Sequence, residues 1–155
     1  MLDTFQTVTY NLHIMLRFEL ELGMLAGKLA VRDLPQAWNA KNEEYLGLIP
    51  PDDRDGVLQD VHWTMNIGGG FQGYTFGNVL SAQFYEAAIV THPDIPMEIS
   101  NGKFDTLHEW LRDKIYQNGP KYSLHELVER ITGGPLQVEP YFRYLKQKFG
   151  ELYSL

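Results

Sequence analysis

Cysteine is absent from the 155-residue sequence, and basic residues and long apolar runs are scarce. Without cysteine there is no disulfide, no thiolate zinc site and no cysteine nucleophile. Lysine and arginine number 13 against 20 aspartates and glutamates, a formal net charge of −7, so nucleic acid is a poor partner. No apolar run approaches the roughly 18 residues that span a bilayer, and the N-terminus does not resemble a signal peptide. We expect a soluble, cytoplasmic protein with no membrane partner.

Apolar residues make up 44% of the chain and aromatic residues 13%. A chain of this length is typical of one domain and can bury a real core. We find no internal repeat and no linker, so we predict a single helical domain over residues 1–155. Histidine, carboxylate, tyrosine and glutamine side chains are left to carry any chemistry.

Apolar residues recur at three- and four-residue steps, and no period-two strand of convincing length is present. The pattern predicts an all-α fold of about six or seven helices. Ser123 and Glu126 form a capping box that opens one of them. We expect helices over 9–29, 34–46, 74–90, 103–117, 123–131 and from 140 onward, a short helix or irregular segment over 56–63, and a proline-containing loop over 93–101.

The histidines do not have the spacing of a zinc helix. Two histidines four residues apart share one helix face and can bind one metal ion, but no two of the five histidines here are four apart. His108-Glu109 and His125-Glu126 begin like such a motif and lack its second histidine. Their plainer interpretation is as polar positions of amphipathic helices.

The run Gly68-Gly69-Gly70 has no phosphate-loop spacing and follows no predicted strand. It is either a flexible turn or a place where the backbone must approach a ligand or a neighbouring helix closely.

The densest polar group is Gln59-Asp60-Val61-His62-Trp63. It brings an amide, a carboxylate and an imidazole together beside an indole that can exclude water. An aspartate near a histidine fixes its tautomer or raises its pKa. These residues are either part of a cleft wall or the solvated start of a helix.

The pattern Gly56-x-x-Gln59-Asp60-x-His62-Trp63 resembles the GxxQDxHW signature of the thermostable (Taq-type) carboxypeptidases, zinc metallopeptidases that remove single C-terminal residues from peptides. Further stretches agree with that family in order and spacing over essentially the whole chain. They are Thr9-Tyr10-Asn11-Leu12-His13 with Arg17-Phe18-Glu19, Asp33-Leu34-Pro35 with Ala37-Trp38-Asn39, Glu44-Tyr45-Leu46-Gly47, Gly77-Asn78 with Ala82-Gln83, and residues 110–153.

The resemblance covers only the C-terminal third of the family, and it has departures. The HExxH helix and the third zinc-ligand glutamate of the family lie upstream of this sequence. The IRxxAD motif would fall at residues 1–6, which read MLDTFQ. Gly70 replaces the first tyrosine of a glycine-tyrosine-phenylalanine-proline turn, whereas Tyr74 aligns with the second tyrosine.

The resemblance implies that Gln59, Asp60 and His62 line a substrate cleft and that Tyr74 donates to the oxyanion formed at the scissile carbonyl. We therefore take Tyr74 and His62 as catalytic candidates and Gln59, Asp60 and Trp63 as substrate-binding candidates. We expect no metal on this chain alone, whereas the complete family enzyme carries zinc or another divalent metal.

Two hypotheses follow. In the first, the chain is the C-terminal portion of a carboxypeptidase acting on peptide C-termini, inactive without the metal-bearing portion. In the second, it is a non-catalytic helical binding or assembly module derived from that family. In either case we expect self-association, as a homo-oligomer, or pairing with a missing N-terminal portion, because aromatic-rich helix faces need cover.

Overall fold

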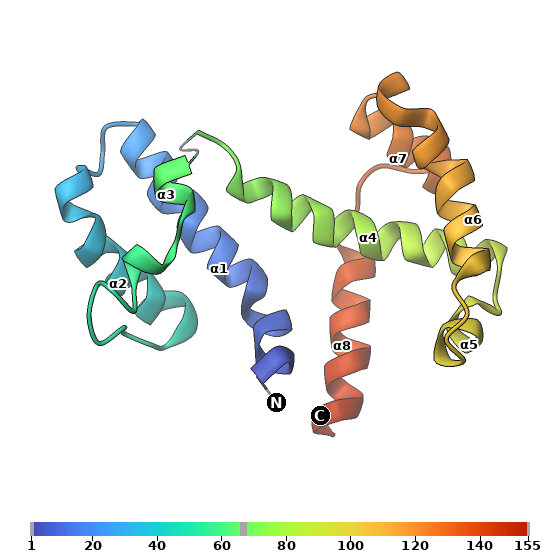
Figure 1. Cartoon of the computed structure of the whole chain (residues 1–155), viewed down its shortest axis with the longest axis horizontal. Coiled ribbons are helices and arrows are strands. Elements are labelled where there is room, and N and C mark those ends of the chain that lie inside the picture. Colours follow the sequence, from blue (N-terminus) through green and yellow to red (C-terminus); the bar gives the residue numbers. More distant parts are fainter. Residues whose placement is uncertain (1, 66–67, 155) are drawn as a thin grey trace. The chain divides into compact units, whose positions relative to one another are not determined.

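The computed structural model describes residues 2–65 and 68–154, and no strand occurs in these ranges (Figure 1). The all-α prediction is confirmed. The elements are α1 (Leu2–Leu25), η1 (Val31–Asp33), α2 (Leu34–Leu46), η2 (Val57–Gln59), α3 (His62–Met65), α4 (Phe71–Thr91), α5 (Ile95–Ser100), α6 (Asp105–Lys114), η3 (Tyr116–Lys121), α7 (Leu124–Thr132) and α8 (Glu139–Tyr153), where η marks a 3-10 helix.

The chain divides into two compact units, Met1–Phe76 and Gly77–Leu155, with the boundary inside α4. Unit 1 is built on α1 packed against α2. Its buried core consists of Leu16, Leu20, Leu34, Trp38 and Val57. The core leucines of α1 lie four residues apart, so both side chains point to the same face, toward α2.

Charged groups also join the two long helices of unit 1. The Lys41 ammonium lies 2.6 Å from the Glu19 carboxylate, and the Tyr45 hydroxyl donates to the same carboxylate at 2.6 Å. Hydrogen bonds from Lys41 and Tyr45 lower the pKa of Glu19, and the bond to Glu19 raises the pKa of Lys41. These groups are largely exposed, so they contribute little to stability.

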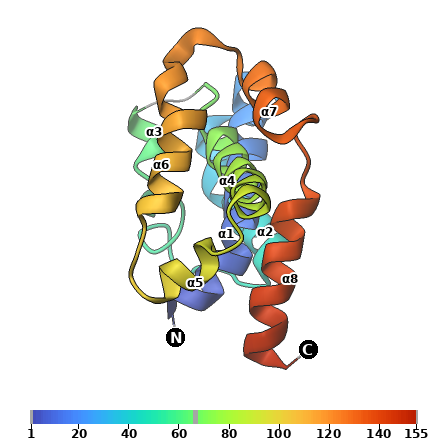
Figure 2. The ribbon, with the colours of Figure 1, turned by 90° about the vertical axis from the view of Figure 1, so that its right-hand side faces the viewer.

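Unit 2 surrounds the C-terminal part of α4 with short helices. Figure 2 shows α6 and α8 on opposite sides of α4. The buried core consists of Phe84, Ala88, Ile95, Trp110 and Val128. Arg143 of α8 donates to the Glu86 carboxylate of α4 at 2.9 and 2.7 Å, which links these two helices at the surface.

The structure differs from the expected element boundaries in several places. The loop expected over 93–101 contains α5, whose Ile95 is fully buried and whose proline lies in the first turn. Proline is tolerated there because the first helical N–H groups have no intrahelical partner. The expected helix over 103–117 ends as α6 at Lys114 and is followed by η3, which contains a kink at Gly119.

Among the helices of the described ranges, none combines the length and the apolar character needed to cross a lipid bilayer.

Candidate functional site

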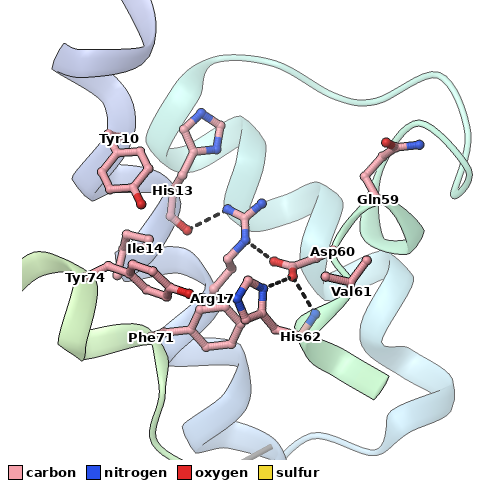
Figure 3. Close-up of a pocket in the computed structure, with 10 residues that line it drawn as sticks. All are labelled: Tyr10, His13, Ile14, Arg17, Gln59, Asp60, Val61, His62, Phe71 and Tyr74. Carbon is pink, nitrogen blue, oxygen red and sulfur yellow. Dashed lines mark hydrogen bonds and ion pairs between the residues drawn. The ribbon is translucent and has the colours of Figure 1, made fainter. Parts of the chain in front are cut away.

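Unit 1 contains an open pocket of about 490 Å³ (Figure 3). Three segments far apart in the sequence supply its walls. They are one face of α1 (Tyr10, His13, Ile14, Arg17), the turn from η2 into α3 (Gln59, Asp60, Val61, His62) and the first turn of α4 (Phe71, Tyr74). The residues from α1 follow helical spacing, so they line one stripe of that helix.

Asp60 is the centre of the polar contacts in this pocket. Its side chain is only 4% exposed and forms an ion pair with Arg17 Nε. It also accepts hydrogen bonds from the His62 backbone N–H at 2.9 Å and from the His62 ring at 2.6 Å. Burial by itself raises the pKa of Asp60, but the bonds from His62 and Arg17 outweigh burial and hold that pKa below its usual range. Asp60 is therefore an ionised carboxylate whose two oxygens both accept hydrogen bonds.

His62 connects Asp60 to the pocket surface. While Nδ1 faces Asp60, Nε2 lies 3.1 Å from the Tyr74 hydroxyl. The imidazole packs against the Phe71 ring at a centroid distance of 5.2 Å and against the Tyr74 ring at 5.8 Å. The two aromatic contacts and the two hydrogen bonds together fix the orientation of the ring. An unbroken chain of contacts therefore runs from Arg17 through Asp60 and His62 to Tyr74.

Arg17 is held on three sides. Its guanidinium lies 4.9 Å from the centre of the Trp38 ring, and it donates to the backbone carbonyl of His13 at 2.8 Å as well as to Asp60. Burial and the positive charge of Arg17 lower the pKa of His13, which favours a neutral imidazole at that position.

The glycine run connects this pocket to the interior of unit 1. The Gly68 N–H donates to Glu21 at 2.8 Å, and Glu21 is only 1% exposed. Gly68 and Gly69 have φ values of 140° and 112°, which side-chain-bearing residues rarely adopt. The run therefore needs glycine for its backbone conformation, which is neither of the two alternatives expected from the sequence, and a side chain at Gly68 would meet no neighbouring atom within 4 Å. The run leads the chain into α4 and so to Tyr74.

The sequence candidates are only partly brought together. Asp60, His62 and Tyr74 are in contact. Gln59 is an exposed lining residue whose amide donates to the Arg54 carbonyl at 2.5 Å. Trp63 instead packs against the core, with its ring 6.1 Å from that of Trp38 and its N–H donating to the Val57 carbonyl at 3.1 Å. A substrate contact for Gln59 or Trp63 stays a prediction.

Arg17, Tyr10 and Phe71 line the pocket but were not among the sequence candidates. The helical spacing of Tyr10, His13 and Arg17 was a usable signal for a polar site. Three polar groups on one stripe of an amphipathic helix indicate that this stripe faces other polar groups. The sequence gives no local indication that this partner is Asp60, 43 residues away.

Among the side chains that the structure describes, in residues 8–65 and 68–154, no group of three or more histidine, aspartate or glutamate side chains is arranged to hold a metal ion.

The chain resembles known proteins over most of its length. The family model for carboxypeptidase Taq (M32) metallopeptidases matches residues 5–149. Thermostable carboxypeptidase 1 of Thermus thermophilus is 41% identical over 147 residues, which is 95% of this chain and 29% of that protein. Carboxypeptidase 1 of Bacillus subtilis is 34% identical over 148 residues, 96% of this chain and 30% of that protein.

Solved structures give the same result. The crystal structure of an M32 carboxypeptidase from Deinococcus radiodurans R1 matches with a TM-score of 0.89 and 55% identity, over 95% of this chain and 30% of that one. The chain thus spans less than a third of the length of these relatives and corresponds to a C-terminal portion of them. It belongs to the carboxypeptidase Taq (M32) family of metallopeptidases.

Proposed function

We propose that unit 1 forms one wall of the peptide cleft of a metallocarboxypeptidase that removes C-terminal amino acids. The observation that carries this proposal is the chain from Asp60 through His62 to Tyr74 at the rim of an open pocket. A buried carboxylate, an oriented imidazole and an exposed phenol supply directed hydrogen bonds to a peptide carbonyl. Family membership supplies the reaction class.

Within this proposal each residue has its own role. Tyr74, 44% exposed, presents a hydroxyl to the scissile carbonyl as charge develops on its oxygen. His62 holds that hydroxyl, and Asp60 holds His62. Gln59 and Trp63 contribute to the wall on which the peptide lies. The metal, zinc in our proposal, is held by residues outside the described chain.

Mixing experiments test this function. The chain is combined with the metal-bearing portion of a family relative, and release of C-terminal amino acids from a peptide is measured. We expect a rate above that of the partner alone, and a loss of about 10²–10³-fold on Tyr74→Phe, the usual cost of removing one oxyanion donor. His108→Ala, at a histidine of unit 2 that also lies beside a tyrosine ring, is the matched control and should leave the rate unchanged.

The alternative is a binding or assembly module without catalysis. Gly70 at the position of the family's first tyrosine, and the absence of arginine from residues 1–6, favour it. Peptide binding with no gain in turnover from the added portion would support the module. A zinc-dependent rate from the combined chains would rule it out.

We also propose that the chain associates with itself or with a further chain. On α1, Val8, Met15, Leu22 and Leu25 are 45%, 46%, 53% and 58% exposed. They recur at seven- and three-residue steps, which places them on one stripe of the helix. Light scattering of the isolated chain should show an average mass that rises with concentration, and a clean monomer over a wide range would contradict the self-association.

A further inference from the structure

Arg17 reaches His62 and Tyr74, the groups proposed to face a substrate, only through Asp60. It contacts Asp60, which contacts His62, which contacts Tyr74. We infer that Arg17 is a positioning residue: acting through Asp60, it fixes the proton of neutral His62 on Nδ1 and so turns the Tyr74 hydroxyl toward His62.

The Arg17 side chain is held in place by three contacts. Its side chain is 19% exposed and lies over the Trp38 ring, with a further bond to the His13 carbonyl. A guanidinium does not lose its charge in proteins. Asp60, 4% exposed beside this fixed charge, therefore stays ionised throughout the pH range in which histidines titrate.

Asp60 determines which ring nitrogen of neutral His62 carries the proton. An ionised carboxylate only accepts hydrogen bonds, so the His62 Nδ1 atom, 2.6 Å from Asp60, must carry the proton. In the neutral ring, Nε2 is then an acceptor. The Tyr74 hydroxyl 3.1 Å away donates to it and has no proton left to donate into the pocket.

A second proton on His62 reverses this last bond. Both ring nitrogens of an imidazolium are donors, so Nε2–H donates to the Tyr74 oxygen, and the Tyr74 hydroxyl proton turns toward the pocket. The groups that set this balance come from all three walls. They are Asp60 beside His62, Tyr10, His13 and Arg17 on α1, and Tyr74 on α4.

The direction of the Tyr74 hydroxyl determines whether it can donate to a substrate, an inference that rests on the proposed function. Tyr74 can stabilise a substrate oxyanion only while both ring nitrogens of His62 carry protons. The positioning of His62 by Arg17 and Asp60 does not depend on that function, and it can be measured in the isolated chain without peptide or metal.

The test is the tautomer of His62, read from ring nitrogen-15 NMR shifts of the full chain at a pH where the ring is neutral. We expect the Nδ1–H form to exceed the Nε2–H form by about tenfold or more, because the bond to Asp60 is charge-assisted. His125 is an internal control: its Nε2 lies 3.2 Å from Glu129, so it should show the opposite tautomer. A dominant Nε2–H form at His62 would overturn the inference. Because the measurement uses the unaltered chain, it does not depend on whether any variant folds.

Two variants separate positioning from mere packing. Arg17→Lys keeps a positive charge beside Asp60 and should keep the Nδ1–H form dominant, whereas Arg17→Met should lower its excess several-fold. Should Arg17→Met fail to fold, Asp60→Asn, which removes the carboxylate charge, should produce the same loss. An unchanged tautomer ratio in a folded Arg17→Met or Asp60→Asn chain would contradict the role given to Arg17.

Discussion

The two units use their buried polar side chains differently. In unit 1, Asp60 and Arg17 connect segments 43 residues apart, and their contacts lead outward to His62 and Tyr74 at an open pocket. In unit 2, the buried Gln83 donates to the Pro135 carbonyl at 2.9 Å and accepts from the Gln137 N–H at 3.0 Å. Together with a bond from Gln83 to the Thr132 hydroxyl at 3.3 Å, they hold the segment that follows α7 against α4.

We interpret the Asp60 network of unit 1 as part of a site and the Gln83 network of unit 2 as part of the fold. A buried polar group must be hydrogen-bonded in either case. Gln83 satisfies backbone groups that would otherwise be unpaired. The Asp60 chain leaves an exposed phenol and an imidazole edge facing solvent, an arrangement that folding alone does not require.

The largest expected effect comes from the core of unit 1. Leu16 is fully buried, so Leu16→Ala should lower the free energy of unfolding by about 2–5 kcal/mol. Fluorotryptophan NMR follows the units separately, because Trp38 and Trp63 lie in unit 1 and Trp110 in unit 2. The signals of unit 1 should be lost at lower denaturant, and Leu48→Ala, at a 68% exposed leucine of the same unit, is the control. Equal loss at Trp110 would show that the units unfold together.

The matching change in unit 2 removes a polar fastening. Gln83→Leu leaves the Pro135 carbonyl and the Gln137 N–H without their partner, at a cost of about 1–3 kcal/mol. The Trp110 signal should report the loss. Gln147→Leu on the exposed face of α8 should cost much less, and a Gln83→Leu chain as stable as wild type would remove the structural role given to Gln83.

A smaller effect is expected at the start of α7. The Ser123 hydroxyl accepts from the Glu126 N–H at 3.3 Å, and the Glu126 carboxylate accepts from the Ser123 N–H at 2.9 Å. Ser123→Ala should cost about 1 kcal/mol, the usual cost of losing a cap, in thermal unfolding followed at Trp110. Ser81→Ala within α4 controls for loss of a hydroxyl, and a larger change there would contradict the capping argument.

Acid should weaken unit 1 through Asp60. Because the folded state holds the pKa of Asp60 below its ordinary value of 3.8, this group stabilises the fold above that pH. The contribution is lost as the pH falls from there through the lowered pKa. Asp60→Asn should flatten this part of the acid unfolding curve at Trp38 and Trp63. An unchanged curve would show that protonation of Asp60 does not contribute to the loss of stability in acid.

Local patterns predicted much of the helical structure. The capping box placed the start of α7 correctly, because both of its hydrogen bonds form within four residues. The loop expected over 93–101 was wrong, because Ile95 of α5 is buried in a core built together with α4, α6 and α7, which no local pattern encodes.

The candidate site was predictable only in part. Asp60 and His62 lie two residues apart, so their contact could be inferred from the sequence. The partnership of Arg17 with Asp60, and that of His62 with Tyr74, depend on how α1, α3 and α4 pack within unit 1. The family signature drew attention to Trp63, whose ring the structure places against Trp38.

The most direct test of the contrast between the units is a titration of the labelled chain with a short peptide, followed by proton-nitrogen NMR. We expect the shift changes to cluster at Arg17, His62 and Tyr74 of unit 1. Tyr74→Phe should make these shift changes smaller, and the signals of Trp110 and Gln83 in unit 2 should not move. Changes confined to unit 2, or none at His62 and Tyr74 at saturating peptide, would contradict the assignment of the cleft wall to unit 1.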